Sequence, residues 1–338
     1  MSRAIRLAVA LAATAAVAPA IAGGAPGYHV TRTIKVPDGG WDYARVDGAT
    51  RKLYIARGTD VTEVDLAHGD AVRAIGAIMR GHAVVPIDGQ KLLLVTSGRD
   101  DSVRLLDTDS GAEVAKIAVG GNPDAALYDA ASGLAATMNA RAGTVSVIDV
   151  AHRQVARTIT LAPGLEYAAL VGKSTLYVNN EDKNEIETAD LATGTVGATI
   201  ALTGCTGPSG LAYDAKTSVV ISACGNSKAA LVDAKAGKLI RLLDIGQGPD
   251  AVILDAARRK AFIPCGRDGT LVVIDLDARG GAKVIDTVAT AKGARTGALD
   301  PTDGTVYLPT ADFGPAPAAG GRPQPVAGSF RVLAVSAP

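Results

Sequence analysis

The runs DAALYD (124–129), LAATMN (134–139), TVSVID (144–149) and QVARTITL (154–161) decide the fold. Each run has the length of a β-strand, Gly, Asp and Asn turn residues separate the runs, and no helical periodicity crosses them. The segment therefore predicts four short strands in succession. Four strands within about 40 residues are typical of one blade of a β-propeller.

Strands that end in aspartate repeat this unit along the whole chain. A first series ends at Asp65, Asp107, Asp149, Asp190, Asp233 and Asp275, with spacings of 42, 42, 41, 43 and 42 residues. A second series, upstream in each unit, ends at Asp47, Asp88, Asp129, Asp214, Asp255 and Asp300, and only the fourth unit lacks this aspartate. A seventh copy of the first series, FRVLAV (330–335), follows after a longer gap. Seven copies predict an all-β, seven-bladed β-propeller with four antiparallel strands per blade.

The last unit ends at its third strand, and the start of the mature chain offers the missing fourth strand. YHVTRTIKV (28–36) is similar to fourth strands such as EVAKIAV (113–119). An open ring would leave sheet edges that invite pairing with other chains. We therefore expect residues 28–36 to complete the blade formed by residues 294–335 and to close the ring.

The N-terminus has the pattern of a signal peptide. Two arginines precede an apolar stretch (7–17) and a small-residue cleavage motif (20–22). We expect residues 1–22 to be cleaved and residues 23–338 to form a single propeller domain. The protein is then expected in the periplasm or outside the cell, with no transmembrane segment in its mature form.

The charge balance limits the classes of partner. The chain has 34 basic and 34 acidic side chains and a formal net charge of zero. A protein without a strong basic field lacks the main driving force for binding nucleic acid or an acidic membrane surface. We expect no nucleic acid partner, and we expect a monomer.

Six motifs carry a resemblance to a known family: NPDAALYD (122–129), TVSVIDV (144–150), GPSGLAYD (207–214), GPDAVILD (248–255), GARTGALDP (293–301) and YLPTADFGPAP (307–317). Over essentially its whole mature length the chain resembles the YVTN-repeat, YncE-like family of exported seven-bladed β-propellers. The resemblance implies a binding or scaffold module and assigns no reaction.

The repeat also predicts which residues meet at the mouth of the central channel. Counting back from the end of each first strand gives one residue per blade: Asp42, His82, Asp124, Glu166, Ser209, Asp250 and Arg295. One interpretation is a ligand site that binds a polar small molecule or a divalent cation such as Ca²⁺ or Mg²⁺. The candidate metal ligands are then Asp124, Glu166 and Asp250. The other interpretation is that the acidic side chains cap local turns and that Arg295 neutralises them.

The sequence leaves the functional class open. Nucleophile elbows, zinc-protease motifs, phosphate-binding loops and haem attachment sites are all absent from it. Our first hypothesis is a module that binds a small ligand or an envelope protein at the channel face. The alternative is a hydrolase or lyase of the lactonase type that depends on a divalent cation. In that enzyme His82 would transfer a proton and Arg295 would orient a substrate carboxylate. A purely structural envelope protein is a third hypothesis.

Two further features fall outside the repeat. Residues 311–328, rich in Pro and Gly, insert a loop into blade seven, and we expect it to cover part of the channel with Phe313 as its apolar anchor. Cys205 lies in the loop that leads into blade five, and Cys224 lies at the end of the second strand of that blade. Both therefore map to the same face of one blade. We expect these two to form a disulfide and Cys265, in the neighbouring blade, to be free.

Overall fold

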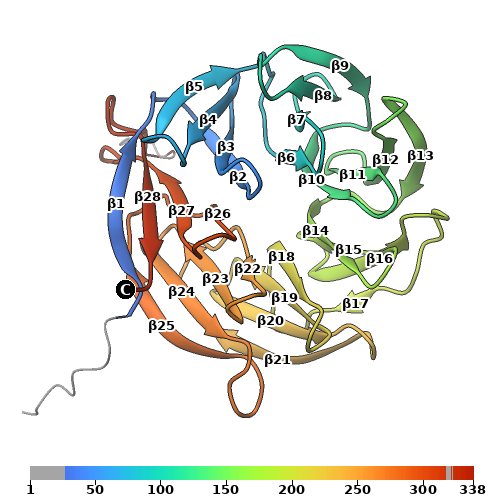
Figure 1. The fold of residues 1–338 in the computed structure, drawn as a ribbon. Helices are drawn as coiled ribbons and strands as arrows, with labels where there is room; N and C mark the ends of the chain where they lie inside the picture. The colour runs from blue at the N-terminus through green and yellow to red at the C-terminus, as the bar shows by residue number, and fades with distance from the viewer. Residues whose placement is uncertain (1–26, 317–320, 322) are drawn as a thin grey trace, which may run out of the picture.

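A computed structural model describes residues 27–316, 321 and 323–338. Seven four-stranded antiparallel sheets are arranged as the blades of a closed ring around a central channel (Figure 1). The described residues form strands, turns and bends, and no helix among them could cross a membrane. The predicted fold class and blade number are confirmed. The predicted signal peptide lies outside the described residues.

The strands of each blade follow one another from the channel to the outer edge (Figure 1). Blades one to three contain β2 (Trp41–Asp47), β3 (Lys52–Arg57), β4 (Val61–Asp65), β5 (Ala71–Ile75); β6 (Val84–Ile87), β7 (Leu92–Ser97), β8 (Ser102–Asp107), β9 (Glu113–Ala118); and β10 (Pro123–Asp129), β11 (Leu134–Asn139), β12 (Thr144–Asp149), β13 (Gln154–Thr160). Blades four and five contain β14 (Leu165–Val171), β15 (Thr175–Asn180), β16 (Glu185–Asp190), β17 (Ile200–Ala201); and β18 (Pro208–Asp214), β19 (Val219–Cys224), β20 (Lys228–Asp233), β21 (Lys238–Asp244). Blades six and seven contain β22 (Ile253–Asp255), β23 (Lys260–Cys265), β24 (Thr270–Asp275), β25 (Lys283–Ala289); and β26 (Ala298–Leu299), β27 (Val306–Thr310), β28 (Arg331–Ser336), β1 (His29–Lys35).

The first strand of the chain closes the ring. β1 pairs antiparallel with β28, with Lys35 opposite Arg331 and His29 opposite Ser336, so the last blade takes its outer strand from the N-terminus. The side chain of Ile34 is buried in the same apolar cluster as Val332 and Phe330. The predicted closure is confirmed, and β1 covers the edge that β28 would otherwise expose.

The two middle strands of each blade are buried along almost their whole length. β11, for example, has five consecutive buried residues, whereas the outer strand β13 alternates between exposed and partly buried positions. A blade packs against a neighbour on each face, so its middle strands meet water on neither side and read as continuous apolar runs. Close approach of adjacent inner strands also selects small residues. A Cβ on Gly210 would lie 2.5 Å from the backbone of Ala251 in the next blade.

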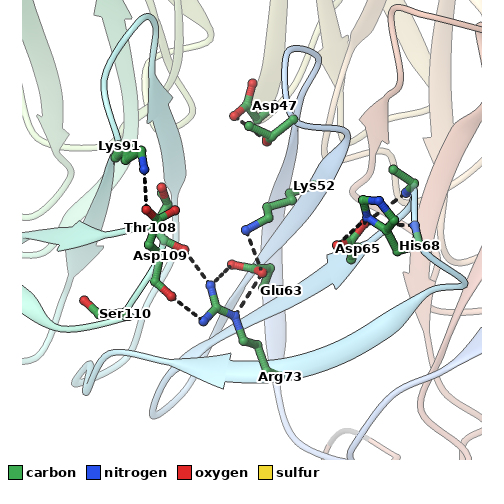
Figure 2. Close-up of polar contacts among 12 residues, drawn as sticks. Asp47, Lys52, Glu63, Asp65, His68, Arg73, Lys91, Thr108, Asp109 and Ser110 are labelled. Carbon is green, nitrogen blue, oxygen red and sulfur yellow. Dashed lines mark hydrogen bonds and ion pairs between the residues drawn. The ribbon is translucent and has the colours of Figure 1, made fainter.

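On the outside of the ring, a buried carboxylate of blade one is paired with two cations, one of which also contacts blade two. Arg73 of β5 makes two hydrogen bonds to the carboxylate of Glu63 and donates to the backbone oxygen of Asp109 in blade two, at 2.7 Å (Figure 2). Lys52 lies 3.2 Å from the same Glu63 carboxylate. Since Glu63 is buried, these two cations supply the compensation that a buried carboxylate requires.

Candidate functional site

A β-bulge in the inner strand places three of the four acidic residues of the channel mouth. In β2 the pairing with β3 shifts between Trp41 and Ala44, which leaves one extra residue on the inner strand. The same shift follows Pro123 in β10, Leu165 in β14 and Pro208 in β18. A bulge re-aims side chains and is common beside binding sites. The residues within the bulges are those that the repeat predicted for the mouth: Asp42, Asp124, Glu166 and Ser209.

Three side chains from blades one to three converge at the mouth. His82 Nδ1 lies 2.7 Å from Asp42 Oδ2 and 3.6 Å from Asp124 Oδ1. One ligand-type atom from each of these residues can be chosen so that all three lie within 4.8 Å of one another. His82 is buried, and the two carboxylates are only partly exposed. Two carboxylate oxygens and an imidazole nitrogen at this spacing form a donor set for a divalent metal ion.

The second ring nitrogen of His82, Nε2, lies beside Gly98 and Asn122. Nε2 is buried without a hydrogen-bond partner among the described residues, and the same holds for Oδ1 of Asn122. Both atoms lie 3.0 Å from the position that a Cβ on Gly98 would occupy. The absence of a side chain at Gly98 therefore leaves room for these two polar groups behind the imidazole.

Arg295 and Asp250 form the opposite side of the mouth. Arg295 Nε donates to Asp250 Oδ2 at 2.7 Å, and its Nη2 lies 3.7 Å from Asp42 Oδ1. Arg295 thus links the carboxylates of blades one and six. Ser209, also predicted for the mouth, donates to the backbone oxygen of Pro249 at 3.4 Å.

Burial and mutual repulsion raise the pKa values of three mouth carboxylates, those of Asp124, Glu166 and Asp250. Burial raises the pKa of Asp124 to about 7, against the opposing charge of His82. Burial raises the pKa of Asp250 to about 6, although Arg295 lowers it. Burial and the charges of Asp124 and Asp250 hold the pKa of Glu166 well above its usual range. An added cation would relieve this repulsion.

The pKa of His82 is raised by its carboxylate neighbours. Burial lowers the pKa, but the hydrogen bond to Asp42 and the charges of Asp124 and Asp42 outweigh this effect. The imidazole therefore carries a proton more readily than a free histidine does. In that state Nδ1 donates to Asp42.

Tyr43 forms the floor of the mouth, and the repeat did not single it out. Its hydroxyl donates to the backbone oxygen of Asp250 at 3.3 Å, and its ring packs on Tyr167 with centroids 4.8 Å apart. Tyr43 follows Asp42 within the same bulge. Its place next to a predicted mouth residue is the sequence feature that could have identified it. Burial and the charge of Asp250 hold the pKa of Tyr43 well above its usual value, and the phenol remains a neutral donor.

The predicted metal ligands are only partly brought together. Asp124 belongs to the group of three, whereas Glu166 and Asp250 do not share a compact donor set among the described residues. Asp42 and His82 take their places. The difference arises because the bulges of blades one and three point Asp42 and Asp124 toward the same histidine.

The disulfide between Cys205 and Cys224 is confirmed, with Cα atoms 5.4 Å apart, and Cys265 is free and buried. In the blade-seven loop, Phe313 lies 6.2 Å from Trp41 between ring centroids, and the amides of Gly328 and Phe330 donate to Asp38. These contacts hold the described part of the loop at the junction of blades seven and one. Residues 317–320 and 322 lie outside the described residues, so the proposed cover over the channel stays a prediction.

Comparison with known proteins supports the fold and no closer relationship. No protein-family model matches the chain, and no curated protein matches it significantly in sequence. A chain of Kuenenia stuttgartiensis hydrazine synthase superposes with a TM-score of 0.71 and 16% identity, over 82% of this chain and 94% of that chain. A chain from the mitotic checkpoint complex gives a TM-score of 0.70 and 15% identity, over 90% and 95%. These similarities show the fold alone: the protein is a seven-bladed β-propeller.

Proposed function

We propose that this protein is an exported binding module of the YVTN-repeat, YncE-like kind, with its ligand site at the channel mouth. The site consists of Asp42, His82, Asp124, Glu166, Ser209, Asp250 and Arg295. The six motifs quoted above support the family. The disulfide between Cys205 and Cys224 supports export to the periplasm or beyond, because such bonds persist in oxidising compartments.

The observation that carries the proposal is the convergence of four carboxylates on one mouth, where Arg295 is the one arginine that forms ion pairs with them among the described residues. Asp42, Asp124, Glu166 and Asp250 come from four different blades, and Arg295 pairs with only two of them. Buried like charges repel one another unless a cation compensates them. A ligand that carries positive charge is therefore the best fit to this surface.

A divalent metal ion is the simplest such ligand. Asp42, His82 and Asp124 would supply one imidazole and two carboxylate ligands, and Glu166 and Asp250 would contribute charge from nearby. A nitrogen ligand favours Zn²⁺ or Mn²⁺ over the Ca²⁺ or Mg²⁺ expected from the carboxylates alone. When Nδ1 binds a metal, Nε2 carries the proton, and a neighbouring oxygen such as that of Asn122 is the kind of acceptor that orients metal-bound histidines.

Thermal unfolding tests this proposal directly, since a ligand that binds the folded state raises the melting temperature. Purified mature protein would be screened with Zn²⁺, Mn²⁺, Ca²⁺, Mg²⁺, polyamines, sugars, organic acids and lactones. We expect stabilisation by a cation in the wild type and loss of that effect in Asp124→Asn and His82→Gln. His68→Gln is the matched control, because His68 also faces a carboxylate, Asp65, but on the exposed outer surface (Figure 2).

Equal stabilisation of the control and the site variants would place the cation elsewhere on the protein. If no small ligand stabilises the wild type, the mouth does not bind one. In that case an envelope protein as the partner becomes the leading hypothesis.

The alternative is a hydrolase or lyase of the lactonase type, and the pair of His82 and Asp42 is the observation that favours it. A histidine oriented by a carboxylate is a common general base. However, Nδ1 is occupied by Asp42, and Nε2 is buried beside Gly98 and Asn122. A substrate would reach His82 only after this pair separates, so binding is the better supported function. Lactone hydrolysis that is abolished by His82→Gln and retained by His68→Gln would reverse this preference.

A further inference from the structure

The part of the channel beyond Tyr43 contains a second cavity, of about 380 Å³. Its walls come from the innermost segments of six blades, all except blade two. The residues that line it follow the mouth residues in the chain, from Tyr43 to Val46 in blade one and from Tyr167 to Leu170 in blade four. Asp42, Asp124, Glu166 and Asp250 do not line it. The channel is thus divided into an acidic mouth and a second chamber.

The chamber is apolar and has one charge. Leucine, valine, isoleucine and alanine side chains line most of it, together with Tyr43, Tyr128 and Tyr167, and Arg45 is the single charged residue in the lining. Ligand pockets in proteins are typically of this size and kind, with apolar walls and a few polar groups that fix orientation.

Arg45 has no acidic partner among the described residues. Its guanidinium donates to the hydroxyl of Tyr167 and lies over the same ring, 5.6 Å from the centroid. By contrast, Arg32 contacts the ring and hydroxyl of Tyr307 in the same manner but also pairs with Asp70. An arginine whose neighbours are neutral keeps hydrogen-bond donors and a full positive charge for a ligand.

From this arrangement we propose that the second chamber binds a small apolar carboxylate. The planar guanidinium of Arg45 matches the two oxygens of one carboxylate. The apolar walls and the three tyrosines match a hydrocarbon or aromatic body. A dianionic phosphate would require more than one cation, and the lining offers only Arg45.

This site is separate from the cation site proposed above, and neither proposal depends on the other. Tyr43 lies between them, with its hydroxyl held by the backbone of Asp250 and its ring packed on Tyr167. The negative charge of the mouth disfavours a carboxylate there. The one charged residue in the lining of the chamber, by contrast, is a cation, Arg45.

Binding of phenylacetate, phenylacetamide and phenethylamine tests the inference, because the three share one aromatic body and differ in charge. By calorimetry we expect phenylacetate to bind the wild type at least about tenfold tighter than either analogue, the ratio expected for a hydrogen-bonded charge pair. Arg45→Gln should remove this preference, whereas Arg32→Gln should retain it.

A second measurement does not depend on the variants folding. Methyl resonances of Leu127 and Leu211, which line the chamber, should shift on addition of phenylacetate to the wild type. The inference is wrong if phenylacetate does not bind, if phenylacetamide binds equally well, or if Arg45→Gln binds as the wild type does.

Discussion

Arg51 donates to Asp300 at 2.9 Å across the junction where the first blade meets the last. The Asp300 side chain is fully buried, and Arg51 also contacts Asp303. Between blades five and six, Arg259 binds Asp214 with two hydrogen bonds of 2.6 and 2.7 Å in the equivalent place. Both arginines have a left-handed backbone, with φ of 53° and 57°. The junction between the first and last blades therefore reuses a contact that the repeat also makes elsewhere.

Replacing Arg51 with alanine should weaken the closure of the ring. Asp300 would remain buried without its cation, and breaking a buried ion pair costs about 3 kcal/mol or more. We expect a lower free energy of unfolding in urea for Arg51→Ala and a similar loss for Arg259→Ala. Arg153→Ala is the control, because Arg153 has the same backbone conformation (φ 56°) and no ion pair among the described contacts. Equal stability of Arg51→Ala and Arg153→Ala would contradict the role of the pair.

The disulfide should stabilise blade five. Cys205 and Cys224 are 19 residues apart, and a cross-link over a loop of that size contributes about 3 kcal/mol in the chain-entropy model. We expect the double variant Cys205→Ala, Cys224→Ala to unfold at lower urea than the wild type and to be insensitive to reductant. Cys265→Ala removes a buried sulfur without removing a cross-link, so it should keep the sensitivity to reductant. The prediction is refuted if the wild type has the same urea unfolding midpoint with and without reductant.

The repeat made most of the fold predictable. A period of 42 residues predicted the number of blades, and the missing fourth strand of the last unit predicted that residues 28–36 close the ring. The same period identified the mouth residues because equivalent positions in a ring meet at its axis. It did not reveal the pairing among them. The contacts of His82 with Asp42 and Asp124 depend on the direction in which each bulge points its side chain, and the spacing of the repeat does not predict that direction.

The divided channel was also not predictable from the repeat. Tyr43 is aromatic where most other blades carry a small residue such as Ala125, and only blade four repeats the tyrosine, as Tyr167. Arg45 is charged where the other blades carry apolar residues such as Leu127. A repeat pattern describes what the blades share and does not show what a residue found in only one or two blades does. Their meaning depends on which blades face one another across the axis, and only the closed ring shows this.

Stability should fall as the pH rises from about 4 to about 7. The pKa of Asp250 is raised to about 6 and that of Asp124 to about 7, so the folded state holds protons that an unfolded carboxyl releases near pH 4. Their stabilising effect is complete below pH 4 and is lost as the pH passes through 6 and 7. The raised pKa of His82 acts in the same direction. We expect a higher melting temperature at pH 5 than at pH 8, measured in EDTA.

The Glu166→Gln variant isolates the origin of this pH dependence. A neutral side chain of the same shape removes one of the repelling charges, so the melting temperature should rise at pH 8 and change little at pH 5. Asp88→Asn, at an exposed carboxyl, should leave the profile unchanged. A Glu166→Gln profile parallel to that of the wild type would show that the mouth carboxylates do not cause the effect.

Gly98→Ala tests the surroundings of His82 without removing a ligand. The added Cβ would lie 3.0 Å from His82 Nε2 and from Asn122 Oδ1, so the imidazole must shift relative to Asp42 and Asp124. Misplaced ligands typically cost tenfold or more in metal affinity. We expect Gly98→Ala to weaken cation-induced thermal stabilisation while the metal-free protein stays folded. Gly58 occupies the equivalent turn of blade one, where a Cβ meets nothing within 4 Å, so Gly58→Ala should bind as the wild type does. Unchanged cation binding in Gly98→Ala would show that the position of His82 does not control the site.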